Sequence, residues 1–450
     1  MNDTIAAIST ALGVGAISII RVSGEDSINV VNKIFKGKDL TKVPTHTINY
    51  GHIIEDDKII DEVLVSVMKS PRTFTAEDIV EINSHGGIST TNKVLELLLR
   101  NGARLATPGE FTKRAFLNGR IDLVEADGIM NLISSKTEKA RELSINQLSG
   151  KVSNNIKELR KKLVSIISNI EVNIDYPEYE DIEVITTDKI KPRLIELKQE
   201  LTSIIEKSEE GKIINQGLTV GIFGRPNVGK SSLLNSLLEE EKAIVTDIEG
   251  TTRDTVEGSI NLNGIILNII DTAGIRETDN IVEKIGVEKS KNIMENCDLC
   301  ILILNNNEEL TPEDIEILNK IKLKKHIILI NKTDLESKID FSILPSDYIK
   351  ISVLRNEGIE DLKQRIMELF NLGELETEDL TYLSDARSIS LLKTSLSYIN
   401  ESINSINNKE PIEIVEINIK DAWESLGEII GETYKEELID ELFSRFCLGK

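Results

Sequence analysis

The run from Gly224 to Ser231, Gly-Arg-Pro-Asn-Val-Gly-Lys-Ser, has the composition of a phosphate-binding loop. An apolar run at 218–223 precedes it and a helical apolar pattern at 233–238 follows it, which is the context this motif requires. The glycines let backbone N–H groups turn toward phosphate oxygens, Lys230 adds a positive charge, and the dipole of the following helix favours an anion. Ser231 offers a hydroxyl to Mg²⁺. The expected phosphate contacts are Asn227, Val228, Gly229, Lys230, Ser231 and Ser232.

Three further motifs, each after an apolar strand-like run, indicate which nucleotide binds. Asp271 is placed to support Mg²⁺ through water, and Gly274 could offer its N–H to the γ-phosphate. The carboxylate of Asp334 can accept hydrogen bonds from N1–H and the exocyclic amine of guanine, which adenine does not reciprocate. Ser352 stands where backbone groups could meet the guanine carbonyl, so we expect GTP. The expected contacts are Asp271, Thr272, Ala273, Gly274, Asn331, Lys332, Thr333, Asp334, Ser352, Val353 and Leu354.

A polar segment at 246–254 lies between the phosphate loop and Asp271. It is predicted to be a switch loop that becomes ordered with the γ-phosphate, with Thr252 joining Ser231 in the Mg²⁺ shell. The alternative is an ordinary surface loop. The expected nucleotide contacts within it are Thr246, Asp247, Ile248, Glu249, Gly250, Thr251 and Thr252.

The residue that orients the hydrolytic water is less obvious. Ras-like enzymes place a glutamine directly after the glycine of the second switch, whereas this chain has Ile275 there. Asn227 could hold a monovalent cation between the phosphates in place of an arginine finger. The polar candidates for orienting water are Arg276, Glu277, Asp279 and Glu283.

Length and composition restrict the class of protein. The 450 residues suffice for two or three domains, and 53 basic against 76 acidic residues give a net charge of −23. This charge argues against broad, sequence-independent nucleic-acid binding, although a local basic patch or a protein partner could bring RNA in. Cys297 and Cys300 have a CxxC spacing but precede the apolar run at 301–304, so we expect them to pack in the core rather than to serve metal or redox chemistry. Without a membrane-spanning run or a signal peptide, we expect a cytoplasmic protein that uses no membrane.

The elements that must position these residues fall into three regions, which predict a multi-domain α/β protein. Residues 1–118 alternate strand-like runs with a helix at 91–100, which indicates a mixed α/β domain. Helical apolar spacing at 119–215 and again at 373–450 predicts one discontinuous helical domain. A Ras-like P-loop GTPase domain at 216–372 is then inserted in it. The aromatic pair Phe443 and Phe446 predicts that the C-terminal tail docks rather than frays.

With these motifs the chain resembles the MnmE (TrmE) family of tRNA modification GTPases over essentially its whole length. The strongest marks are Asp-Thr-Ile-Ala-Ala-Ile at 3–8, Arg-Val-Ser-Gly at 21–24, Glu-Ile-Asn-Ser-His-Gly-Gly at 81–87, Gly-Glu-Phe-Thr at 109–112, and the terminal Cys-Leu-Gly-Lys at 447–450. The phosphate loop is less specific, because the Era and EngA/Der GTPases share nearly the same run.

The resemblance implies an activity and its partners. Such proteins act with the FAD-dependent MnmG, in a heterotetramer or larger complex, to install an aminomethyl or carboxymethylaminomethyl group at carbon five of the wobble uridine of certain tRNAs. The N-terminal domain is implied to form a homodimer and to bind a one-carbon tetrahydrofolate of the formyl or methylene type. By motif match, the folate site would be lined by Arg21, Glu81, Arg120 and Lys450. Arginine and lysine suit the glutamate carboxylates, and Glu81 suits the amino-pyrimidine edge of the pterin.

The resemblance also implies how GTP is hydrolysed. It supports K⁺ held by Asn227, Thr246, Ile248 and Thr251, selects Glu283 as the water-orienting residue, and implies that GTPase domains meet across the dimer when K⁺ and GTP are bound. Cys447 is implied to take part in the modification chemistry.

The sequence departs from the family pattern at a few positions. Ala11-Leu12 replaces a proline-rich turn, Val14 stands where a basic residue is common, and Arg120 replaces a frequent lysine, which keeps the charge but changes the donor geometry. The runner-up interpretation is an Era- or EngA-type ribosome-assembly GTPase, but neither a second phosphate loop nor a KH-like Gly-x-x-Gly loop in a basic context occurs here. A dynamin-like mechanoenzyme would call for a lipid-binding patch, which the sequence does not show.

Overall fold

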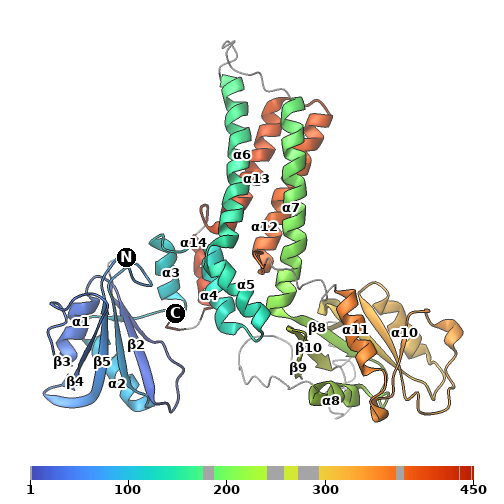
Figure 1. Cartoon of the computed structure of the whole chain (residues 1–450), viewed down its shortest axis with the longest axis horizontal. Coiled ribbons are helices and arrows are strands. Elements are labelled where there is room, and N and C mark those ends of the chain that lie inside the picture. Colours follow the sequence, from blue (N-terminus) through green and yellow to red (C-terminus); the bar gives the residue numbers. More distant parts are fainter. Residues whose placement is uncertain are drawn as a thin grey trace. The chain divides into compact units, whose positions relative to one another are not determined.

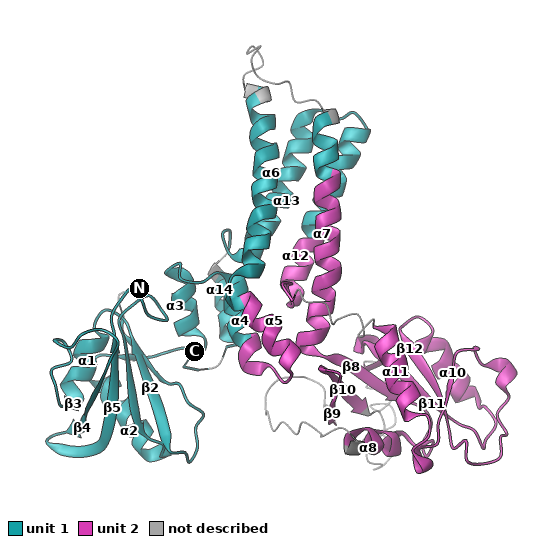
Figure 2. Cartoon of the chain, in the orientation of Figure 1, with its two compact units in different colours: residues 1–130, 148–194, 394–450 teal, residues 131–147, 195–393 magenta. Residues whose placement is uncertain are grey.

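The computed structural model of the chain describes residues 3–175, 187–240, 258–271, 293–370, 380–434, 436–446 and 448–449. Contacts within the chain divide it into two compact units (Figure 2). Unit 1 comprises Met1–Met130, Leu148–Leu194 and Thr394–Lys450, and unit 2 comprises Asn131–Gln147 and Ile195–Lys393. The domain boundaries at 118, 215 and 372 stay a prediction, because the two compact units divide the helical residues at other positions.

The N-terminal part of unit 1 is a seven-stranded sheet with the strand order β3-β4-β5-β6-β2-β1-β7. Neighbouring strands are antiparallel except β1 and β7, which are parallel. The strand-like runs of the sequence at 16–22, 45–54, 59–68 and 78–83 match β2, β4, β5 and β6 to within about two residues. The strands are β1 (Ile5–Ile8), β2 (Ile17–Ser23), β3 (Phe35–Lys36), β4 (Thr47–Glu55), β5 (Lys58–Met68), β6 (Ile79–His85) and β7 (Arg104–Leu105).

The two faces of this sheet differ. Helices α1 (Ser27–Ile34) and α2 (Ile88–Arg100) pack on one face, where Ile20, Val80 and Ile82 lie in a buried apolar cluster. Because strand side chains alternate, Arg21 and Glu81 belong to the opposite face. The sheet thus separates an apolar core from a face that carries charged side chains.

The remaining parts of unit 1 are helical, and α6 packs along α13 (Figure 1). The predicted apolar stripe of α6 is buried, from Val152 to Ile170. Buried Arg160 of the same helix lies over the ring of Trp423, with its Cζ 4.2 Å from the ring centroid. Besides α1 and α2, the described helices that lie wholly in this unit are α3 (Glu110–Leu117), α6 (Lys151–Asp175), α13 (Ile412–Ile430) and α14 (Glu436–Ser444).

Unit 2 contains a six-stranded sheet with the order β13-β12-β11-β8-β10-β9. All neighbours are parallel except β9 and β10, and apolar clusters cover both faces, as expected of a parallel sheet. Cys297 and Cys300 are buried in one cluster, so the prediction of core packing is confirmed. The strands are β8 (Leu218–Phe223), β9 (Gly258–Leu262), β10 (Ile265–Asp271), β11 (Leu299–Asn305), β12 (His326–Asn331) and β13 (Ile349–Lys350).

The same unit contains the helices α8 (Lys230–Glu240), α10 (Pro312–Ile321) and α11 (Ile359–Leu369). Three helices cross the unit boundaries, namely α4 (Leu123–Ser134), α7 (Thr187–Gln216) and α12 (Ala386–Asn407). Helix α5 (Glu138–Leu148) lies almost wholly in unit 2. In the part of the chain that the structure describes, no helix combines the length and the apolar character needed to cross a membrane.

Candidate functional site

The phosphate loop joins β8 to α8. Gly229 has φ +105, and a Cβ placed there would lie 2.2 Å from Nδ2 of Asn331, so only glycine fits. Asn227 also has a left-handed backbone, with φ +63, a conformation that asparagine tolerates better than most residues. Lys230 is buried, and its Nζ donates to the carbonyl oxygens of Gly224 at 2.6 Å and Arg225 at 2.9 Å. The ammonium group is therefore held at the loop itself.

Asn331 connects the phosphate loop to the motifs predicted to bind guanine. Its side chain is 3% exposed, its Nδ2 donates to the Val228 carbonyl at 2.8 Å, and its Oδ1 accepts from the Val353 N–H at 3.2 Å. Ser352 Oγ donates to Asp334 Oδ1 at 2.7 Å, and this hydrogen bond lowers the pKa of Asp334. The structure thus brings three predicted motifs together and keeps Asp334 an ionised acceptor, as guanine recognition requires.

Arg225 has a partner that sequence reasoning missed. Its Nε lies 2.9 Å from Oδ2 of buried Asp314, and its Nη2 lies 3.0 Å from Oε2 of Glu308. Asp314 also forms the capping box of α10 with Thr311. The Thr-Pro-Glu-Asp run at 311–314 is a recognisable signal for the start of a helix. It does not indicate that Asp314 pairs with Arg225. This pair ties the phosphate loop to the first turn of α10.

Several predicted nucleotide residues lie outside the described part of the chain. Asp271 ends β10, where its backbone pairs with Ile222 at the end of β8, so it belongs to the same sheet edge as the phosphate loop. The predicted site residues that lie outside the described residues are Thr246, Asp247, Ile248, Glu249, Gly250, Thr251, Thr252, Thr272, Ala273, Gly274, Glu283, Cys447 and Lys450.

A second cluster forms on the N-terminal sheet. Arg21 and Glu81 are direct partners across β2 and β6, and Arg21 Nε lies 2.8 Å from Glu81 Oε1. The Arg21 Cζ lies 5.6 Å from the ring centroids of both Phe74 and Phe111. Arg120 approaches the same Phe74, with its Cζ 5.3 Å from the ring centroid and its Nη1 donating to the Phe74 carbonyl at 3.1 Å. Two of the four residues predicted to bind folate, Arg21 and Arg120, therefore meet at Phe74, and a third, Glu81, is paired with Arg21.

The C-terminal tail reaches this cluster. The carbonyl oxygen of Gly449 accepts from Ser9 Oγ at 3.1 Å and from Arg21 Nη1 at 3.4 Å. Phe443 and Phe446 are buried, with ring centroids 5.1 Å apart. The prediction that the tail docks is confirmed for these residues.

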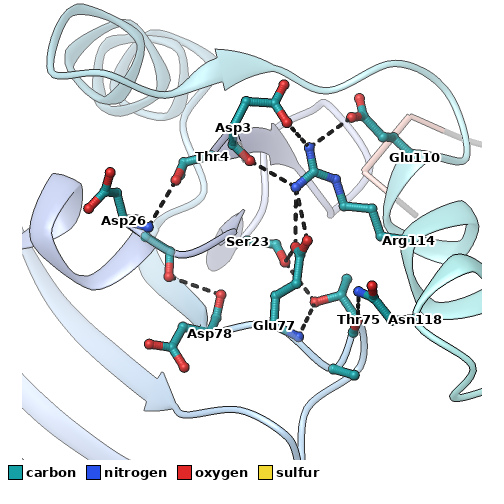
Figure 3. Close-up of polar contacts among 12 residues, drawn as sticks. Asp3, Thr4, Ser23, Asp26, Thr75, Glu77, Asp78, Glu110, Arg114 and Asn118 are labelled. Carbon is teal, nitrogen blue, oxygen red and sulfur yellow. Dashed lines mark hydrogen bonds and ion pairs between the residues drawn. The ribbon is translucent and has the colours of Figure 1, made fainter. Parts of the chain in front are cut away.

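A buried ion-pair network supports the loop that carries Phe74 (Figure 3). Arg114 of α3 is 1% exposed, and its guanidinium contacts Asp3 at 2.7 Å, Glu110 at 3.1 Å and Glu77 at 3.2 Å. Burial alone would raise the pKa of Glu110, but hydrogen bonds from Arg104, the Thr107 N–H and Arg114 lower it to about 2. The network surrounds a buried cation with three carboxylates and lowers the pKa of two of them, Asp3 and Glu110.

The same network fixes the loop between β5 and β6. Ser23 Oγ lies 2.7 Å from Thr75 Oγ1 and donates to Glu77 Oε2 at 2.8 Å, while Asn118 Nδ2 donates to the Thr75 carbonyl at 2.7 Å (Figure 3). Sequence reasoning missed Phe74, Arg114 and Asn118 as parts of this site. The one available signal was the Gly-Glu-Phe-Thr motif at 109–112, which contains the network residue Glu110.

Comparisons with known proteins cover the whole chain. The model of the MnmE helical domain matches residues 123–447, and the model of the GTP-binding protein TrmE N-terminus matches residues 4–120. The tRNA modification GTPase MnmE of Streptococcus thermophilus is 53% identical over 450 residues, which covers 100% of this chain and 98% of that one. MnmE of Bacillus mycoides is 52% identical over 455 residues, which covers 100% of this chain and 99% of that one.

Proposed function

The chain belongs to the MnmE family of tRNA modification GTPases, and from this premise we propose that it hydrolyses GTP to drive the modification of carbon five of the wobble uridine in certain tRNAs. The modification is an aminomethyl or carboxymethylaminomethyl group, and the proposed partner is a FAD-dependent protein of the MnmG type. The Era- or EngA-type alternative has no support from these matches, because the likeness to MnmE relatives extends over both ends of the chain.

The observation that carries the GTPase proposal is the joining of three motifs through Asn331. Its amide connects the phosphate loop at Val228 with the Ser352–Leu354 segment, and Asp334 lies beside them in ionised form. A ligand that satisfies all three must carry phosphates at one end and a guanine edge at the other. Gly229 leaves no room for a Cβ, and the ammonium group of Lys230 is held at the loop by the Gly224 carbonyl. Both features fit a bound phosphate chain.

Candidate ligands for the metal ions lie in the phosphate loop and in the 246–254 segment. Mg²⁺ would be held by Ser231 and Thr252, and K⁺ by Asn227, Thr246, Ile248 and Thr251. These cations neutralise charge on the phosphates when bound. Asn227, whose amide is proposed to face K⁺, has a left-handed backbone within the phosphate loop. Glu283 is proposed to orient the attacking water.

The N-terminal cluster fits a one-carbon tetrahydrofolate of the formyl or methylene type. Arg21, Glu81 and Arg120 converge, and the docked tail carries Gly449 to Arg21, next in sequence to Lys450. Folate supplies a one-carbon unit when bound, and the side chains supply cations for its carboxylates and a carboxylate for its pterin edge. Cys447 of the same tail is proposed to take part in the modification chemistry.

The exposed face of the N-terminal sheet supports a homodimer formed through this domain. Ile17, Ile48, Tyr50 and Leu64 are large, exposed side chains of this face, as the strand registers show. Apolar side chains gathered on an exposed sheet face are typical of an interaction surface. K⁺- and GTP-dependent contact between GTPase domains across such a dimer is proposed to drive the cycle.

Two measurements test this proposal. The purified protein should hydrolyse GTP much faster in K⁺ than in Na⁺, and Glu283→Ala should bind GTP normally but hydrolyse it slowly. Mass spectrometry of tRNA from cells lacking the protein should show wobble uridines without the carbon-five group. Unchanged wobble uridines would refute the tRNA function, whereas equal rates in the two salts would refute only the role of K⁺.

A further inference from the structure

We propose that Phe74 determines the specificity of the folate site, by forming the wall against which the planar ring system of the ligand packs. The inference rests on the proposed folate function and assigns to that site a residue that the motifs do not include. Phe74 lies in the loop between β5 and β6, is partly buried, and packs against the apolar cluster of Ile5, Ala7, Ala106 and Phe111.

The position of Phe74 among the proposed ligand-binding residues is the first support. The guanidinium carbons of Arg21 and Arg120 lie 5.6 and 5.3 Å from its ring centroid, and Glu81 contacts Arg21 at 2.8 Å. Guanidinium groups are attracted to the negative face of an aromatic ring, so Phe74 also orders the two cations that are expected to meet carboxylates. The ring is therefore central to the cluster.

The chemistry of the ligand is the second support. A folate combines a flat fused ring with an amino-pyrimidine edge and a glutamate with carboxylates. Glu81 can meet the edge, and Arg120 can meet a carboxylate, but neither offers a surface for the flat ring. Sites for flat ligands are usually lined by aromatic or apolar side chains with a few polar groups that fix the orientation. Phe74 supplies that missing surface.

The rigidity of the loop is the third support. The Phe74 carbonyl accepts from Arg120 at 3.1 Å and the next carbonyl, of Thr75, accepts from Asn118 at 2.7 Å. Glu77, at the other end of the loop, is fixed by buried Arg114 at 3.2 Å (Figure 3). A wall held in this way before the ligand arrives does not lose conformational freedom on binding, which favours both affinity and discrimination.

The test compares two probes on the full-length protein by isothermal titration calorimetry. The first is 5-formyltetrahydrofolate, and the second is 5-formyltetrahydropteroate, which has the same rings but no glutamate. Phe74→Leu keeps an apolar side chain but removes the ring. It should weaken 5-formyltetrahydropteroate by a factor of about ten and 5-formyltetrahydrofolate by at least as much, because the ring also orders Arg120. Phe74→Tyr keeps the ring and should bind both probes within about twofold of the wild type.

Arg120→Gln is the matched control, because it should weaken 5-formyltetrahydrofolate much more than 5-formyltetrahydropteroate. Circular dichroism spectra and thermal melts of the three variants should match those of the wild type, which shows that they are folded. Unaltered binding by Phe74→Leu would overturn the proposal, and so would a loss confined to the probe with glutamate, because Phe74 would then act only through Arg120. If the wild type binds neither probe, the folate function itself is refuted.

Discussion

Arg21 and Gly449, which are 428 residues apart in the chain, are joined by a hydrogen bond from the Arg21 Nη1 to the Gly449 carbonyl oxygen. The same arginine is paired with Glu81 and packs against the rings of Phe74 and Phe111. One side chain therefore connects the centre of the N-terminal sheet, the loop proposed to form the ligand wall, and the C-terminal tail. The C-terminal tail therefore belongs to the cluster around Arg21 and Glu81.

Gly449→Ala should release the tail. Gly449 has φ +86, and a Cβ there would lie 2.3 Å from the Ile8 carbonyl oxygen, so alanine meets both backbone strain and a clash that no side-chain movement relieves. We expect carboxypeptidase to remove the last residues several times faster than in the wild type, as followed by mass spectrometry. Gly264→Ala has the same strain at φ +87 but meets only the flexible Lys139 side chain, so it should leave tail removal unchanged.

Arg114→Met should destabilise unit 1. Arg114 is buried, and removing it leaves Glu110 and Glu77 without one of their cations, a change that costs about 3 kcal/mol or more. The exposed pair of Arg141 with Glu138 is the control, because Arg141→Met should change stability by less than about 1 kcal/mol. Differential scanning calorimetry measures both. Equal shifts in the two variants would contradict a structural role for the network.

Glu110 should make the stability of unit 1 sensitive to acid. The pKa of Glu110 is lowered from 4.5 to about 2 in the folded protein, so its ionised form stabilises the fold above pH 4.5. That contribution is lost as the pH falls from 4.5 toward 2. Glu110→Gln should therefore melt well below the wild type at pH 7, and the difference should narrow toward pH 3. A constant difference across this range, measured by thermal melts, would show that Glu110 does not titrate as expected.

The nucleotide site shows how much local sequence can predict. Each motif lies at the end of a strand. Because parallel strands bring their carboxyl ends to one edge of the sheet, the proximity of Val228, Asn331 and Ser352 could be expected from the order of the motifs alone. The pair of Arg225 with Asp314 could not, because it joins segments 89 residues apart whose approach depends on where α10 begins. A sequence motif identifies a functional residue, but the tertiary packing determines which other residue it contacts.

The N-terminal site was less predictable for a related reason. The positions of its strands were predicted, but the strand order places β2 between β6 and β1, and this non-sequential order is what pairs Arg21 with Glu81. Phe74 belongs to no recognised motif, and it becomes part of the site only through a loop held by buried contacts. The network around Arg114 likewise joins residues 3, 77 and 110, which no periodicity relates.

Asn227→Gly should abolish the preference of GTP hydrolysis for K⁺. Glycine adopts the left-handed φ of +63 without strain, so this change removes the amide and leaves the turn, whereas alanine would add backbone strain. We expect the hydrolysis rate in K⁺ to fall to the rate in Na⁺, with GTP affinity within about threefold of the wild type because Lys230 and Asp334 are untouched. Lys409→Gly replaces another left-handed residue, with φ +58, in unit 1 and should keep the full K⁺ preference. If Asn227→Gly kept a K⁺ preference equal to that of the wild type, the cation would have to be held by other residues, and the role proposed for this amide would be wrong.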